Sequence, residues 1–95
     1  MASVYILYSK KLSRFYTGSC KDLAYRLNQH INKEYIRSFT AKADDWELYF
    51  FKDDLSYQHA RLIESHIKKM RSSKFKENIK KYPEIIEKLI QKYSE

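Results

Sequence analysis

The sequence predicts an α/β (α+β) fold in which a small three-stranded antiparallel sheet is flanked by helices. Three short segments are rich in β-branched and aromatic residues, and the first two lie close enough together to form a hairpin. The remainder of the chain carries apolar residues at helical spacing. Of the 95 residues, 43% are hydrophobic and 16% aromatic, which is sufficient for one core. We therefore expect a single domain over residues 1–95.

The three expected strands cover residues 4–9, 14–18 and 46–51. Val, Ile, Tyr and Phe dominate them, and these residue types favour strands. Residues 10–13 are short and mostly polar, which predicts a turn that joins the first two strands into an antiparallel hairpin. The third strand pairs with this hairpin after an intervening helix.

The helices are predicted from apolar spacing and from residues that cap helix ends. Residues 22–31 form the first helix with Asp22 as its N-cap, residues 72–80 form a short basic helix, and Pro83 begins a last helix over about 83–94. A polar stretch, with a short helical turn near Tyr35, follows the first helix. The expected inward stripes are Leu23, Leu27 and Ile31, then Ala60, Ile63, Ile67 and Met70 after a Ser56 N-cap, and finally Ile86, Leu89 and Ile90.

The charge distribution points to a polyanionic partner. The chain holds 19 Lys and Arg against 12 Asp and Glu, for a formal net charge of +7. Residues 61–81 contain eight of the basic residues and only two acidic ones. A concentrated basic segment is typical of nucleic-acid binding. The alternative is a solvated helix surface on a merely basic protein.

The cysteine count and the hydropathy pattern exclude other classes of protein. The single cysteine, Cys20, allows neither an internal disulfide nor a multi-cysteine zinc site. No apolar run approaches the roughly 18 residues of a membrane span. The N-terminus has no basic segment followed by an apolar one, so nothing suggests secretion. We expect a cytoplasmic protein with no membrane partner and no small-molecule cofactor.

The hairpin places two tyrosines on the same face of the sheet. With a turn at residues 10–13, Tyr5 opposes Gly18 and Leu7 opposes Tyr16, so that Tyr5 and Tyr16 are diagonal neighbours. Gly18 leaves open space beside Tyr5. The alternative is that both are ordinary half-buried strand tyrosines.

Two helices carry further polar residues that fit the same site. Arg26 and His30 are four residues apart and share one helix face. Glu64 lies at the edge of its apolar stripe, with Lys68 one turn later. One interpretation is that these side chains and the two tyrosines line a single pocket. Taken separately, they fit a helix edge and an exposed ion pair equally well.

The order of these residues resembles the GIY-YIG endonuclease family. The paired motif of that family is similar to Val4-Tyr5 and Tyr16-Thr17-Gly18 in this chain. The resemblance covers about residues 3–75 and is closest to small stand-alone members related to the nuclease domain of bacterial excision repair. Departures are Ser3 at the first glycine of the motif, Thr17 at the middle of the second motif, and Cys20 where Thr is frequent. The other matching segments are Asp22-Leu23-x-x-Arg26-Leu27-x-x-His30, Ser38-x-Thr40, Trp46-Glu47-Leu48, Ala60-x-x-x-Glu64 and Lys68.

The resemblance implies a role for each candidate residue. Glu64 binds Mg²⁺ or another divalent cation such as Mn²⁺. Arg26 supplies a forked cation for the phosphate, and His30 assists proton transfer or contacts the phosphate. Tyr5 is the expected general base, with its pKa lowered by nearby positive charge. Tyr16 is its hydrogen-bond partner or the alternative base.

The expected function is therefore that of a metal-dependent endonuclease that hydrolyses DNA, in repair or recombination. The expected nucleic-acid contacts are Lys68, Lys69, Arg71, Lys74 and Asn78. One alternative is a catalytically inactive nucleic-acid-binding module that uses the basic 61–81 segment. A second is a non-catalytic interaction protein with a tyrosine-rich surface. The DNA structure, the use of RNA and the oligomeric state are left open by the sequence.

Overall fold

Four helices and a three-stranded sheet make up the described part of this chain. The structure, a computed structural model, describes residues 1–31 and 45–93, without the side chains of residues 30 and 31. The expected turn near Tyr35 and the Ser38-x-Thr40 segment lie outside the described residues. In chain order the elements are β1 (Ala2–Ser9), β2 (Arg14–Cys20), α1 (Leu23–Ile31), β3 (Glu47–Leu55), α2 (Tyr57–Lys69), α3 (Ser73–Lys81) and α4 (Pro83–Tyr93). This architecture confirms the predicted α+β fold.

The sheet is antiparallel with the order β2-β1-β3, so β1 is its central strand. The predicted hairpin register is confirmed, because Tyr5 pairs with Gly18 and Leu7 with Tyr16. The backbone N–H of Ser13 donates to the carbonyl of Lys10 at 3.3 Å and closes the expected turn. Register shifts interrupt the pairing of β1 with β3, where Asp54 has a left-handed φ of 62° that Asp tolerates.

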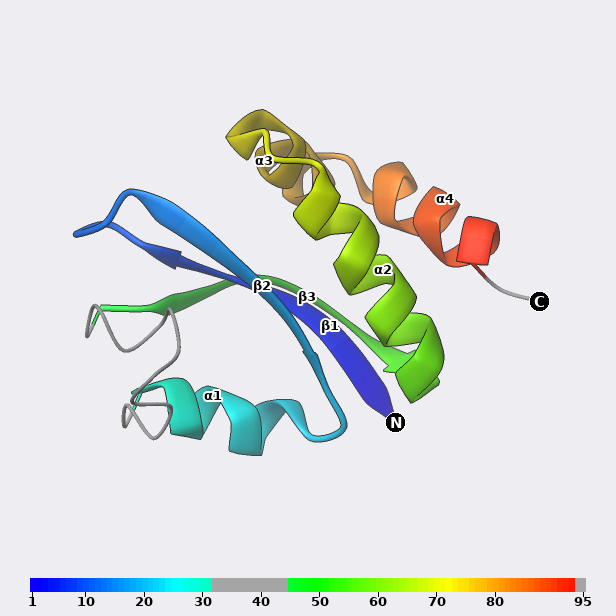
Figure 1. Cartoon of the computed structure of the whole chain (residues 1–95), viewed down its shortest axis with the longest axis horizontal. Coiled ribbons are helices and arrows are strands. Elements are labelled where there is room, and N and C mark those ends of the chain that lie inside the picture. The colour runs from blue at the N-terminus through cyan, green and yellow to red at the C-terminus, as the bar shows by residue number, and fades with distance from the viewer. Residues whose placement is uncertain (32–44, 94–95) are drawn as a thin grey trace.

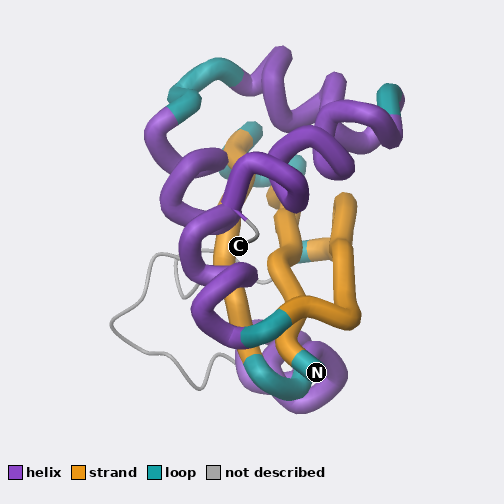
Figure 2. The backbone as a smooth tube through the Cα atoms, turned by 90° about the vertical axis from the view of Figure 1, so that its right-hand side faces the viewer, coloured by secondary structure: helices purple, strands orange, loops and turns teal. Residues whose placement is uncertain are grey.

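The helices cover both faces of the sheet. Figure 1 shows α1 on one face and α2, α3 and α4 on the other, and Figure 2 shows the same separation from the side. Successive strand residues point to opposite faces, so each strand supplies side chains to both layers. On the α1 face the core consists of Tyr5, Leu7, Cys20 and Trp46, with Leu23 and Leu27 of α1 packed against it. On the opposite face Val4 and Ile6 join Ala60, Ile63, Ile67, Ile79, Ile86 and Leu89.

The predicted helix starts agree with the structure. The Asp22 carboxylate accepts a hydrogen bond from the N–H of Tyr25 at 3.1 Å, and the Ser56 hydroxyl accepts one from His59 at 3.1 Å. Both bonds satisfy a backbone donor that the first helical turn leaves unpaired. Pro83 begins α4 as expected.

Met70 does not continue the inward stripe of α2, so that prediction is wrong. The helix ends at Lys69, and Met70 is its C-cap, with a backbone N–H that bonds to the Ile67 carbonyl. Because the chain leaves the helix there, the Met70 side chain is 40% exposed. Within the described residues, no helix has the length and apolar character of a membrane span.

Candidate active site

Tyr5 is enclosed between the sheet and α1. Its side chain has no exposed surface and packs with Leu7, Cys20 and Trp46. Gly18 stands directly beside it, on the neighbouring strand. A methyl group at Gly18 would lie 2.5 Å from the Tyr5 hydroxyl oxygen and 2.6 Å from the ring carbon that bears it. The Tyr5 ring therefore fills the space expected beside Gly18, and this position accepts only glycine without movement of the ring.

Burial raises the pKa of the Tyr5 hydroxyl well above its usual value near 10. The neighbouring Tyr16 raises it further, whereas the charge of Arg26 and a hydrogen bond from that side chain lower it. Desolvation outweighs the arginine. The expectation that Arg26 brings the Tyr5 pKa down is therefore wrong for the net effect, although Arg26 does act in that direction.

Tyr16 lies at the edge of the α1 layer, next to the opposite layer. Its half-buried ring meets Trp46 edge-on, with 6.4 Å between ring centroids. The ammonium group of Lys68, from α2, lies 5.8 Å from the centroid of the same ring. Lys68 therefore reaches around strand β2 from the other face of the sheet.

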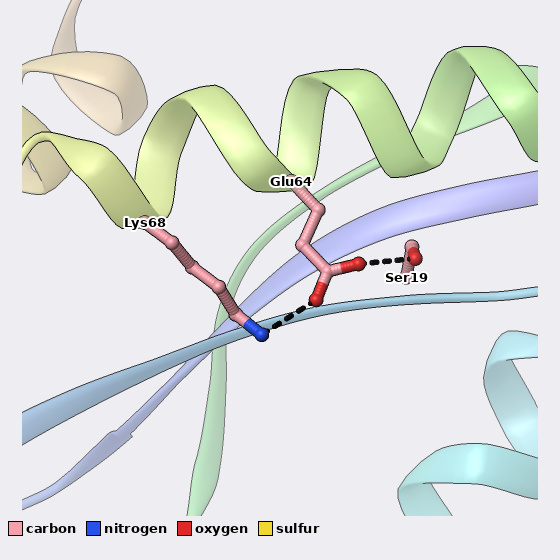
Figure 3. Close-up of polar contacts among 3 residues, drawn as sticks. All are labelled: Ser19, Glu64 and Lys68. Carbon is pink, nitrogen blue, oxygen red and sulfur yellow. Dashed lines mark hydrogen bonds and ion pairs between the residues drawn. The ribbon is translucent and has the colours of Figure 1, made fainter.

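Glu64 is held between strand β2 and the next turn of α2. The hydroxyl of Ser19 donates to Glu64 Oε1 at 2.5 Å, and Lys68 Nζ lies 2.7 Å from Oε2. Figure 3 shows the Glu64 and Lys68 side chains both running from α2 toward β2. The Glu64 side chain is 18% exposed and that of Lys68 is 50% exposed. The carboxylate is thus fixed but still reachable from solvent.

The candidate residues group around the edge strand β2. On its α1 face, Tyr5 interacts with both Arg26 and Tyr16. Around the edge, Lys68 connects Tyr16 to Glu64. The His30 backbone belongs to α1, but its side chain lies outside the described part of the chain.

Two adjoining hollows extend from Glu64 along this edge. The first, which we call the glutamate hollow, is lined by Arg61, Glu64, Ser65, Lys68, Lys69 and Arg71. The second, which we call the basic hollow, shares Lys68 and Arg71 with it and adds Arg14, Tyr16, Thr17 and Lys76, among others. The expected contact residues Lys68, Lys69 and Arg71 therefore surround the carboxylate. Lys74 and Asn78, both on α3, line neither hollow. Lys74 is exposed, whereas Asn78 is partly buried, and its backbone carbonyl accepts a hydrogen bond from the Tyr82 N–H at 2.7 Å.

A comparison with models of protein families shows which family this chain belongs to. The model of the GIY-YIG catalytic domain matches residues 1–78, which include every candidate residue described above. The chain belongs to the GIY-YIG family. No curated protein and no solved structure gives a significant match. The family is one of nucleases, so nucleic acid is the substrate class that this GIY-YIG domain implies.

The donor set of the GIY-YIG site fits a hard divalent cation held by one carboxylate. Among the described residues, no group of three or more His, Cys, Asp and Glu side chains is placed to enclose a metal. Mg²⁺ is commonly bound in proteins by one or two carboxylates, with water and substrate phosphate as its other ligands. Lys68 is ion-paired with the Glu64 carboxylate, so a metal ion at this position would replace the lysine.

Two residues of the GIY-YIG site were not predicted from the sequence. Ser19 fixes the Glu64 carboxylate, and alternation along β2 is the signal that places it on the α2 face, opposite Gly18 and Cys20. Thr17 lines the basic hollow, and its buried hydroxyl has no hydrogen-bond partner among the described residues. Its departure from the family motif is visible in the sequence, but the missing partner is not.

Proposed function

We propose that this GIY-YIG domain is a metal-dependent endonuclease that hydrolyses DNA phosphodiester bonds, in repair or recombination. The observation that carries the proposal is the fixed carboxylate of Glu64 beside a row of cations on the surface. Phosphodiester hydrolysis needs positive charge at the phosphate, a group that accepts a proton from water, and a stabilised leaving oxygen. Each requirement has a candidate side chain at the β2 edge.

The phosphate group is contacted by Arg26 and Lys68. The guanidinium of Arg26 presents several N–H donors in the forked arrangement that suits phosphate oxygens. Lys68 is half exposed and lies between Glu64 and Tyr16, so a modest side-chain rotation carries its ammonium group toward a bound phosphate. His30 remains a proposed assistant because of its place in the motif.

Tyr16 is the better placed of the two tyrosines to act as the general base. A base has to come within hydrogen-bond reach of the attacking water. Tyr5 has no exposed surface and a raised pKa, and both properties oppose proton abstraction. We therefore assign Tyr5 to the positioning of Arg26 and Tyr16, in place of the role as base expected from the sequence.

Glu64 is the proposed ligand for Mg²⁺, or for another divalent cation such as Mn²⁺. Such an ion, when bound, supplies positive charge that stabilises the leaving oxygen. Ser19 keeps the carboxylate oriented by its hydrogen bond to Oε1. When no metal ion is bound, Lys68 pairs with Oε2 of Glu64. This ion pair lowers the free-energy cost of keeping a charged, largely buried carboxylate beside the helix.

Cleavage of DNA under single-turnover conditions tests this assignment. Glu64→Gln preserves the shape of the side chain but removes its charge, so we expect cleavage to be abolished while DNA affinity is retained. Tyr16→Phe should slow cleavage by about 10²–10⁴-fold, the usual cost of removing a general base. Tyr5→Phe should have a smaller effect.

The matched control is Glu87→Gln. Glu87 is a carboxylate on α4 paired with Lys52 at 3.6 Å, and this change should leave cleavage unaltered. Normal cleavage by both tyrosine variants would refute the proposed base. Metal-independent DNA binding without cleavage by the wild type would instead support the inactive binding module.

A further inference from the structure

Three aromatic rings gather on the α2 face of the sheet, one from each strand. The ring centroid of Phe15 lies 4.8 Å from that of Tyr8 and 5.0 Å from that of Tyr49, and the two tyrosine centroids are 6.3 Å apart. Tyr8 shares its strand face with Val4 and Ile6, which the helices bury completely. The three rings remain only half-buried. Aromatic surface is therefore left accessible where the helix layer ends.

These rings line a third hollow, which we call the aromatic hollow. Its other lining residues are Ser13, Ser73, Glu77, Lys80 and Lys81. It shares Ser13, Phe15 and Ser73 with the basic hollow, and the basic hollow in turn shares Lys68 and Arg71 with the glutamate hollow. Shared residues thus link the three hollows in a row, which runs from Glu64 to the aromatic rings and which we call the path.

The chemistry changes along this path. The basic hollow presents Arg14, Lys68, Arg71 and Lys76, and the residues that line it include no carboxylate. This combination suits the phosphates of a nucleic-acid backbone. The aromatic hollow instead has a mixed charge, with the Glu77 carboxylate beside Lys80 and Lys81, and three aromatic rings line it. Those rings suit a flat aromatic group attached to a phosphate in the neighbouring basic hollow.

We propose that the aromatic hollow binds an unpaired nucleobase of the strand whose phosphates occupy the basic hollow. The substrate of this domain is then a single-stranded or branched nucleic acid, not a continuous duplex. In a duplex each base is stacked between its neighbours, and its faces are not available to a protein ring. The inference rests on the proposed nuclease function and adds the substrate class to it.

Lys80 fits the role of a side chain that opens or closes this hollow. Its ammonium group lies 4.4 Å from the centroid of the Tyr49 ring. A cation over an aromatic face is weakly held at an exposed position, so a base can displace it. The displaced lysine then remains beside the hollow, where it can contact the adjoining phosphate.

Binding measured without metal separates this inference from catalysis. Fluorescence anisotropy in EDTA would compare a short single strand, the same strand with abasic positions, and a duplex. For wild type we expect the intact strand to bind about five- to a hundredfold more tightly than the abasic strand, because base–aromatic stacking has that strength. Equal binding of the intact and abasic strands would overturn the inference without requiring any variant.

Variants of Tyr49 then locate the stacking surface. Tyr49→Leu should lower affinity for the intact strand to that for the abasic strand, while binding of the duplex and the abasic strand is preserved. Tyr49→Phe retains the ring and should retain the preference, so the pair of variants distinguishes stacking from a general loss of folding. A uniform loss of affinity for all three ligands in Tyr49→Leu would refute a base-binding role.

Tyr57→Leu provides the matched control. Like Tyr49, Tyr57 has cations near its ring, Lys21 at 5.1 Å and Arg61 at 5.8 Å, but it is exposed at the start of α2 and lines none of the three hollows. Its substitution should leave the preference for the intact strand over the abasic strand unchanged.

Two results with the wild-type protein distinguish the proposals. Wild type that binds and cuts a duplex as well as a single strand would overturn this inference alone. Wild type that neither binds nor cuts any nucleic acid would overturn the proposed function as well.

Discussion

Thr17 carries a buried hydroxyl group on strand β2. The residue is 3% exposed, and its hydroxyl has no hydrogen-bond partner among the described residues. A buried donor without a partner costs about 1–3 kcal/mol. We expect Thr17→Val, which replaces the hydroxyl with a methyl group of similar size, to raise the free energy of unfolding by about 1 kcal/mol. Urea unfolding at neutral pH measures this change.

Thr17→Ser is the control for this substitution. It keeps the hydroxyl and removes the methyl group, so it should lower the free energy of unfolding by about 1 kcal/mol. A less stable Thr17→Val protein would mean that a buried water satisfies the hydroxyl. In that case Thr17→Val would not raise the free energy of unfolding, because the substitution removes the hydroxyl to which the buried water is bonded.

A hydrogen bond between His66 and Tyr93 joins α2 to α4. Nδ1 of His66 and the Tyr93 hydroxyl are 2.8 Å apart, and the Phe75 ring of α3 lies 6.2 Å from the imidazole. Burial lowers the pKa of His66, and the positive charges of Lys92 and Lys69 lower it further. The neutral imidazole is therefore the form that the folded protein prefers.

This preference predicts a loss of stability in acid. A histidine whose pKa is lower in the folded state contributes stability above its unfolded pKa of about 6.5, and loses that contribution as the pH falls through the folded value. His66→Asn cannot gain this charge. We expect its free energy of unfolding to fall less than that of wild type between neutral and mildly acidic pH, as measured by urea titrations. Parallel pH profiles for the two proteins would contradict this assignment.

Local pattern predicted the start of the elements better than their ends. Asp22 and Ser56 cap helices because a side-chain acceptor next to an apolar stripe is a local signal. The third strand was expected to stop at residue 51, but β3 runs to Leu55 through Lys52, Asp53 and Asp54. These charged residues have low strand preference. The strand continues through them because Lys52 and Leu55, on either side of Asp53 and Asp54, pair with β1, which composition does not reveal.

The candidate site was predictable to the extent that its residues form a motif in sequence. Tyr5, Tyr16, Arg26 and Glu64 follow from spacing and family resemblance. The relative burial of the two tyrosines depends on α1 packing over the sheet, so the raised pKa of Tyr5 is a tertiary property. The aromatic hollow joins residues from three strands and α3, and no single segment contains its pattern.

At the scale of the molecule, positive charge is distributed unevenly over the residues that the structure describes. The glutamate and basic hollows gather cations at the β2 edge, whereas α4 carries acidic and basic residues together. Removing one cation that binds a phosphate makes the slope of log K against log salt shallower by about 0.9 for duplex DNA. We expect Lys69→Glu with Arg71→Glu, at two cations that line the hollows, to weaken DNA binding and to make this slope shallower by about two. Titrations at several salt concentrations measure the slope.

Lys88→Glu with Lys92→Glu makes the same change in net charge on α4. If DNA binds along the hollows, the double substitution on α4 should change the slope of log K against log salt much less than the double substitution near the hollows. Equal effects from both pairs would show that only the overall charge of the protein attracts DNA, and the proposed path along β2 would be wrong.

The position of β2 at the edge of the sheet has a consequence for solubility. An edge strand exposes backbone N–H and C=O groups that can pair with a strand of another molecule, and such pairing leads to aggregation. Arg14 on β2 and Lys68 beside it place positive charge along this edge. Two copies that approach edge to edge therefore repel one another. The cations proposed to attract nucleic acid are therefore also expected to oppose edge-to-edge pairing, and substitutions that neutralise them should increase self-association, which light scattering would detect.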